Sequence, residues 1–131
     1  VEMHEVLGDE NMFLFGLHAD EVVRLKREGY TPQKLYARDE SLRAVIDKLK
    51  QGFSDGSTYE DIASRLLLND EYMLLQDFAS YCAAEQRMAE TYARSEDWNR
   101  KSLLNIARSG IFAADRAVAQ YADTIWHVEH K

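Results

Sequence analysis

The hydrophobic positions of this chain follow a helical spacing over nearly its whole length. Apolar side chains recur three and four residues apart, between residues that can begin or end a helix. This spacing predicts a short turn over residues 1–7 and about seven helices. The helices are expected over 19–28, from Thr31, from Asp39 to Gly52, from Ser57, from Asp77, from Ser95 to Gly110, and over 114–126.

One stretch does not fit the helical spacing. Met12, Phe13, Leu14 and Phe15 form a continuous apolar run that Gly16 closes. Such a run is typical of a strand buried on both faces, as in a parallel sheet. No later stretch resembles a second strand that could pair with it. The residues alone therefore predict a mainly α fold with one short strand whose sheet is unexplained.

Two helix starts are predicted from side-chain chemistry. The Ser57 hydroxyl and the Glu60 carboxylate have the spacing of a capping box, in which each side chain bonds the other residue's backbone N–H. Asp77 stands where it could cap the longest helix. Both positions would fix where a helix begins.

Composition and charge narrow the class of protein. The chain has 131 residues, the size of one domain, and a formal net charge of -7. This charge argues against a general binder of nucleic acid or of an anionic membrane. No apolar run approaches the ~20 residues that span a bilayer. Cys82 is the only cysteine, so we expect no internal disulfide and a cytoplasmic location.

Candidate chemistry is sparse. His127 and His130 have the spacing that can place two imidazoles on one helical face, but two ligands near a chain end make a poor metal site. We therefore expect no metal. Cys82 lies on an apolar helical face, which favours an inert buried thiol over a nucleophile.

Two further groups of residues have structural explanations. Paired carboxylates occur only in the first turns of predicted helices, where the helix dipole favours them without any catalytic role; they are Asp20 and Glu21, Glu60 and Asp61, and Glu96 and Asp97. The Tyr and Trp residues at helical spacing are more typical of a core stripe than of a sugar-binding platform. From the residues alone, the chain is a helical domain of unknown purpose.

Longer motifs at both ends resemble one enzyme family. The segment VEMHEVLGDENMFLFGLHADEV is similar to a stretch of the glycogen (alpha-glucan) phosphorylases, and the segment from Arg27 to Ser54 follows the same family. The last part, WNRKSLLNIARSGIFAADRAVAQYADTIWHVE, resembles the closing segment of these enzymes. Its matching residues are Trp98, Asn105, Ile106, Ala107, Ser109, Gly110, Phe112, Asp115, Arg116, Tyr121, Ala122, Ile125 and Trp126. One departure is Ala113-Ala114, where the family usually has hydroxyl residues that can cap the last helix.

The resemblance implies a parent enzyme with two Rossmann-like domains of the glycosyltransferase B type. Such an enzyme transfers terminal alpha-1,4-linked glucosyl units of a glucan to orthophosphate, uses pyridoxal 5'-phosphate, and is expected to form a homodimer. The resemblance does not indicate whether the glucan is glycogen, starch or a maltodextrin. Residues 1–16 would be the last strand unit of the C-terminal Rossmann-like domain. Residues 17–131 would be its helical region, whose final helix, about 114–126, crosses toward the N-terminal domain.

The same resemblance places the active site elsewhere. The lysine that holds pyridoxal phosphate is expected before Val1, so no catalytic, cofactor-binding or metal residue is expected in this chain, and no bound cofactor. The expected partner is the rest of the parent enzyme, which would bind alpha-glucan and phosphate. Alone, the chain is expected to be inactive and could self-associate through Met12, Phe13, Leu14 and Phe15. The alternative is a stand-alone acidic helical module that binds a partner protein.

Overall fold

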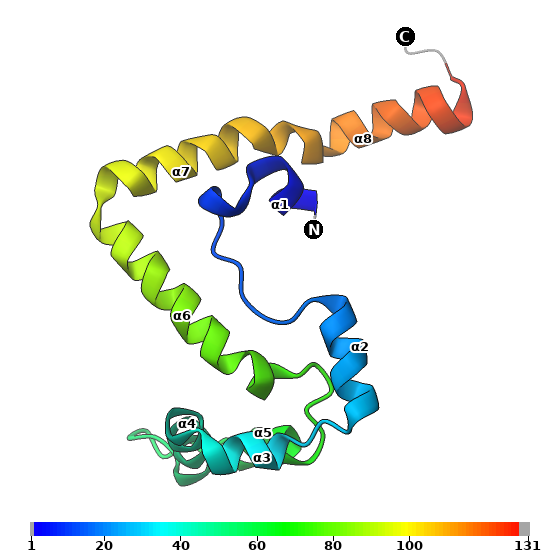
Figure 1. Ribbon diagram of the computed structural model, residues 1–131. Coiled ribbons are helices and arrows are strands. Elements are labelled where there is room, and N and C mark those ends of the chain that lie inside the picture. The colour runs from blue at the N-terminus through cyan, green and yellow to red at the C-terminus, as the bar shows by residue number, and fades with distance from the viewer. Residues whose placement is uncertain (1, 129–131) are drawn as a thin grey trace. The chain divides into compact units, whose positions relative to one another are not determined.

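A computed structural model describes residues 2–128, and all regular structure in that range is helical (Figure 1). The predicted mainly α fold is confirmed. The elements are α1 (Glu2–Leu7), η1 (Asp9–Asn11), α2 (Ala19–Glu28), α3 (Pro32–Arg38), α4 (Glu40–Gln51), α5 (Glu60–Leu68), α6 (Leu74–Ala93), α7 (Ser95–Arg108), η2 (Ser109–Phe112), α8 (Ala114–Tyr121) and η3 (Ala122–Trp126). The last of these is a π-helix that continues α8, so the two together span the predicted final helix.

The chain divides into two compact units. The terminal unit combines the residues up to Leu14 with those from Glu85 onward, and the central unit is Phe15–Ala84. In the terminal unit, α7 contacts α1, η1 and η2, and α8 contacts η2 and η3. In the central unit, α3, α4 and α5 contact one another.

The central unit holds the main hydrophobic core. Leu42 and Ile46 of α4 are buried against Ala63 of α5 and Leu75 of α6. The helical spacing in the sequence correctly predicted that Leu42 and Ile46 face inward. The start of α4 is also as predicted, because the Asp39 carboxylate accepts a hydrogen bond from the Leu42 N–H at 2.9 Å.

Two predicted helix caps are wrong. α5 begins at Glu60 without a side-chain cap, because the Ser57 hydroxyl donates instead to the Asp55 carboxylate at 2.6 Å within the preceding loop. α6 begins at Leu74, three residues before Asp77. Its first N–H groups are bonded by an aspartate that comes earlier, Asp70, which the sequence reasoning did not consider.

Asp70 is a buried carboxylate at the start of α6. It is 5 % exposed and accepts hydrogen bonds from the backbone N–H groups of Leu74 and Leu75, both at 2.8 Å. The Tyr30 hydroxyl donates to the same carboxylate at 2.7 Å. Burial, and then the hydrogen bond to Asp70, raises the pKa of Tyr30. Asp70 thus links the end of α2 to the beginning of α6.

The predicted strand at Met12–Phe15 is not observed in the described residues. The run follows an unpaired path between η1 and Gly16, and Met12 has extended backbone angles (Figure 1). A strand needs a neighbouring strand to bond its backbone groups, and residues 2–128 contain none. Within the terminal unit, the Arg87 guanidinium donates instead to the Leu14 carbonyl at 3.1 Å.

The end of this run is held in the central unit by side chains of α6. The Gly16 N–H donates to the Ser80 hydroxyl and the Leu17 N–H to the Asp77 carboxylate, each at 3.0 Å. Gly16 has a φ of +88°, and a Cβ built there would lie 2.8 Å from the Asp77 carboxylate. Glycine is therefore required at this turn for both its backbone conformation and its small size.

Candidate functional site

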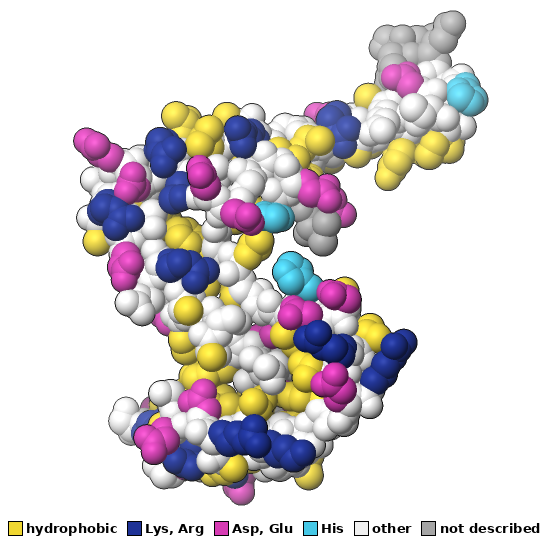
Figure 2. Space-filling view, viewed as in Figure 1, with side chains coloured by type: hydrophobic (Ala, Val, Ile, Leu, Met, Phe, Trp, Pro, Cys, Tyr) yellow, Lys and Arg dark blue, Asp and Glu magenta, His cyan; other side chains and the backbone are white. Residues whose placement is uncertain are grey.

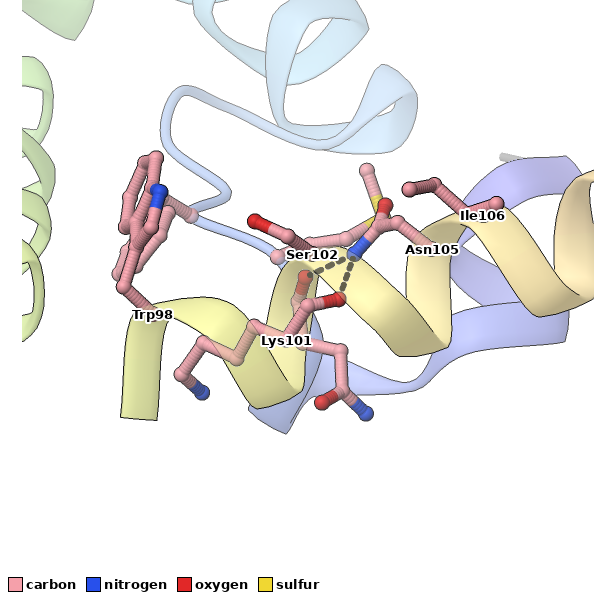
Figure 3. Close-up of a pocket in the computed structure, with 8 residues that line it drawn as sticks. Trp98, Lys101, Ser102, Asn105 and Ile106 are labelled. Atoms are coloured by element: carbon pink, nitrogen blue, oxygen red, sulfur yellow. Dashed lines mark hydrogen bonds between the residues drawn. The ribbon is translucent and has the colours of Figure 1, made fainter. Parts of the chain in front are cut away.

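The candidate site is an open pocket in the terminal unit, between α7 and the residues that follow η1 (Figure 3). Its volume is about 450 Å³. It is lined by Asn11, Met12, Phe13, Trp98, Lys101, Ser102, Asn105 and Ile106. Residues 98, 101, 102 and 105 are three or four apart, so a single helix brings them to one face.

One side of the pocket is aromatic. The rings of Phe13 and Trp98 are stacked with their centroids 6.4 Å apart and an interplanar angle of 17°. Tyr92 meets Trp98 edge to face at 5.0 Å. The Lys101 ammonium lies 5.9 Å from the Phe13 centroid, within the range of a cation–π contact. These contacts hold the apolar run against α7 and leave one face of the pocket hydrophobic.

The other side of the pocket is polar. Asn105 donates hydrogen bonds from its amide nitrogen to the carbonyl of Asn11 at 3.2 Å and to the carbonyl of Lys101 at 2.9 Å, as the dashed lines in Figure 3 show. The Lys101 ammonium donates to the Glu10 carbonyl. Lys101 and Asn105 of α7 thus bond backbone carbonyls of η1.

Arg108 extends the same row by one helical turn. Its guanidinium donates to the carbonyls of Val6 at 3.0 Å and Leu7 at 3.3 Å, at the end of α1. The last carbonyls of a helix have no partner within the helix, so an outside donor stabilises them. We call Lys101, Asn105 and Arg108 the carbonyl grip, because all three donate to backbone carbonyls of residues 6–11.

The chemistry available in the pocket is limited. Its lining has no carboxylate, imidazole or thiol, so the Ser102 hydroxyl has no carboxylate or imidazole base beside it in the lining. Lys101 is the only amine in the lining, and its ammonium already donates to the Glu10 carbonyl. These residues do not fit pyridoxal phosphate, which needs a free lysine beside a phosphate cradle. The apolar part of the lining comes from Met12, Phe13, Trp98 and Ile106.

The residues singled out from the sequence are spread over both units. His127 Nδ1 lies 2.9 Å from the Asp123 carbonyl, while His130 lies outside the described residues. No group of three His, Cys, Asp or Glu side chains that could hold a metal occurs among residues 2–128. Cys82 is exposed, so its predicted burial is wrong. Tyr81 and Met88, apolar residues of the same part of α6, are exposed as well.

Two of the paired carboxylates have the structural role that their position indicates. Glu21 accepts a hydrogen bond from the His18 N–H at 2.9 Å and so caps the start of α2. Asp97, in the first turn of α7, accepts from the Arg94 side chain at 2.7 Å, and this hydrogen bond lowers the pKa of Asp97.

Sequence reasoning missed the carbonyl grip. Asn105 was identified only as part of a family motif, and Lys101 and Arg108 were not considered. A signal was available, because the three polar residues at positions 101, 105 and 108 share one face of a helix. That face would be taken for a solvent-exposed one, since nothing in the local sequence shows that distant carbonyls lie opposite it.

The comparisons with known proteins agree on one class. The family model described as carbohydrate phosphorylase matches residues 1–128. This chain therefore belongs to the carbohydrate phosphorylase family.

Individual relatives are more specific. The chain is 39% identical to the muscle form of glycogen phosphorylase from Bos taurus and 36% identical to glycogen phosphorylase from Synechocystis sp.. It is 35% identical to the brain form from Rattus norvegicus. Each match covers 98% of this chain but only 16% of the relative. None of the helices in the described part of the chain is long and apolar enough to cross a membrane.

Proposed function

We propose that this chain is the C-terminal structural part of a glycogen or alpha-glucan phosphorylase. The whole enzyme transfers terminal alpha-1,4-linked glucosyl units to orthophosphate and releases glucose 1-phosphate. The observation that carries the proposal is the family match, which runs from residue 1 to residue 128. The parent enzyme is a cytoplasmic glycosyltransferase that depends on pyridoxal phosphate and forms a homodimer.

The role assigned to this chain is structural, not catalytic. We assign no catalytic or cofactor-binding residue to this chain. The lysine that holds the cofactor belongs to another part of the parent. The geometry supports this role because Lys101 and Asn105, two polar residues of the pocket, are engaged with backbone carbonyls. Asp70 also has a structural role, because its carboxylate accepts hydrogen bonds from the first N–H groups of α6.

The proposal assigns two regions of the chain to different parts of the parent's C-terminal domain. In the parent, residues 1–16 would form the last strand unit of the C-terminal Rossmann-like domain, where strands outside these 131 residues would supply the neighbours that Met12–Phe15 lack here, and residues 17–131 would form its helical region. The final helix, about 114–126, crosses toward the N-terminal domain. In support, Figure 2 shows hydrophobic side chains at the surface along α8. The exposed ones in α8 and η3 are Val118, Tyr121, Ile125 and Trp126.

Expression of the complete gene tests the proposal. The full gene product is expected to release glucose 1-phosphate from glycogen and phosphate, and to show the absorbance of bound pyridoxal phosphate. The 131-residue chain is expected to do neither. Turnover by the 131-residue chain alone would contradict the structural role. A gene that encodes no further phosphorylase sequence would contradict the assignment itself.

A further inference from the structure

The helix that carries the carbonyl grip has a second, apolar face. With about 100° between successive residues of an α-helix, Leu103 lies about 160° around α7 from both Lys101 and Asn105. Leu103 is 66 % exposed and Ile106 is 71 % exposed. We call Leu103, Ile106 and the exposed Ala107 the outer face of α7. Figure 2 shows hydrophobic side chains at the surface over this helix.

The outer face borders the pocket described above. Ile106 belongs to the outer face and also lines the pocket, next to Asn105 (Figure 3). A segment that packs on the outer face could therefore insert an apolar side chain into the pocket beside it. η2 follows α7 directly and adds two more exposed apolar side chains, Ile111 and Phe112.

The apolar side chains exposed in this segment are large and close together in the sequence. Leu103, Ile106, Ile111 and Phe112 are each at least 44 % exposed. Single exposed apolar residues are normal on a protein surface, whereas a contiguous apolar patch marks an interaction site. This group therefore indicates a surface that another segment covers.

We propose that the outer face of α7 docks an apolar segment of the phosphorylase chain that lies outside these 131 residues. The inference rests on the proposed function. It follows from the length of the relatives, since this chain spans only 16% of them. A segment of the same chain has a high effective concentration, which favours it over a second copy. The net charge of -7 disfavours phosphate-rich partners.

Oxidative footprinting with mass spectrometry tests the docking. The full gene product and the 131-residue chain are exposed to hydroxyl radicals under identical conditions. Leu103 and Ile106 are expected to be oxidised in the 131-residue chain and protected in the full product. Leu42, which is buried within the central unit, serves as the control and is expected to be protected in both. Equal oxidation of Leu103 and Ile106 in the two proteins would overturn the inference.

A charged substitution gives a second, independent readout. Leu103→Asp is expected to lower the Tm of the full gene product by at least about 2 °C, because it places a charge in a buried contact. In the 131-residue chain the same substitution is expected to change the helical circular dichroism little. The control is Gln33→Asp, at an exposed polar position of α3 that is not part of the outer face. An unchanged Tm in the full product would contradict docking.

The two proposals can fail separately. If the full product releases glucose 1-phosphate while Leu103 and Ile106 are oxidised freely, only the docking inference is wrong. If the two residues are protected but no glucose 1-phosphate forms, only the proposed activity is wrong. Protection in the 131-residue chain that appears only at concentrations where light scattering shows a dimer would identify a second copy as the occupant and overturn the inference.

Discussion

At the scale of single residues, the turn after the apolar run depends on Gly16. Its N–H donates to Ser80, and the N–H of the next residue, Leu17, donates to Asp77. The carboxylate of Asp77 lies so close to Gly16 that no larger residue fits without moving it. This single position therefore combines a left-handed backbone with a steric limit, and the two can be separated experimentally.

We predict that Gly16→Ala lowers the free energy of unfolding more than Gly56→Ala. Both glycines have a positive φ, so each substitution is expected to lose about 1 kcal/mol from backbone strain. A Cβ at Gly56 meets nothing within 4 Å, whereas one at Gly16 displaces Asp77 from Leu17. We expect Gly16→Ala to lose roughly 2 kcal/mol or more in urea denaturation. Equal losses would show that Asp77 moves aside freely.

The pair of Tyr30 and Asp70 makes stability depend on pH in the alkaline range. The pKa of Tyr30 is raised above its ordinary value of 10.0 in the folded chain. The folded state therefore holds the phenol proton more tightly than the unfolded state. The stabilisation that this difference represents is complete below pH 10 and is lost as pH rises toward the folded pKa.

We predict that Tyr30→Phe reduces the alkaline loss of stability. In denaturant unfolding measured from pH 8 to pH 11, the native chain should lose free energy above pH 10 more steeply than the variant. Tyr36 should contribute a slope of its own, because its hydrogen bond to Asp47 raises its pKa. Tyr72→Phe, at a tyrosine that is 75 % exposed, is the control for removing a hydroxyl elsewhere in the chain. A Tyr30→Phe profile parallel to the native one would contradict the linkage.

At the scale of elements, helix ends that depend on residues close in the sequence could be predicted. Caps and helical spacing correctly gave the bounds of α2, which ends before Gly29, and the start of α4 at Asp39. The start of α6 did not, because Met73 has a positive φ and Asp70 bonds N–H groups four and five residues ahead. A cap that acts across an irregular turn has no simple sequence signature.

In α7, local features could be predicted from the sequence but distant contacts could not. Its length and its polar first turn could be predicted, and its end was placed within two residues. The partners of Lys101, Asn105 and Arg108 could not be, since they are carbonyls about a hundred positions away. The pocket was likewise not predictable, because it forms only where Phe13 and Trp98 meet.

We predict that Asn105→Ala loosens η1 and α1 from α7. The change removes the hydrogen bonds to Asn11 and Lys101, which should lower the free energy of unfolding by about 1 kcal/mol. Amide exchange in residues 2–11 should become faster. Asn99→Ala removes an equivalent side chain from an exposed position of the same helix. If both variants exchange at the same rate as the native chain, the carbonyl grip does not hold these elements.

At the scale of the whole molecule, the fold class was predictable but the placement of the apolar run was not. Four apolar residues in a row predict a buried segment, but Leu14 is 46 % and Phe15 is 54 % exposed. An apolar run indicates that its side chains need to be buried, and residues 2–128 do not bury Leu14 and Phe15 fully. The Tyr and Trp residues at helical spacing were predicted to form a core stripe. Three of them, Tyr72, Tyr92 and Trp126, are exposed in the structure.

We predict that the isolated chain self-associates through Met12, Phe13, Leu14 and Phe15. Light scattering should give a mass above 15.1 kDa that rises with concentration. The double substitution Leu14→Lys and Phe15→Lys should restore the monomer mass, because charges on an exposed edge oppose pairing. Val45→Lys, at a position of similar exposure, should not. A monomer at every concentration, with rapid amide exchange over residues 12–15, would contradict the prediction.

The carbonyl grip also constrains how the chain can be made in the cell. Its hydrogen bonds join residues 91, 94 and 102 positions apart. A ribosome that adds roughly 5 to 20 residues per second needs about 5 to 20 s to cross that distance. During this interval α1 has emerged while the side chains that secure it have not been synthesised. The carbonyls of residues 6–11 therefore lack their donors from α7 until translation has passed Arg108.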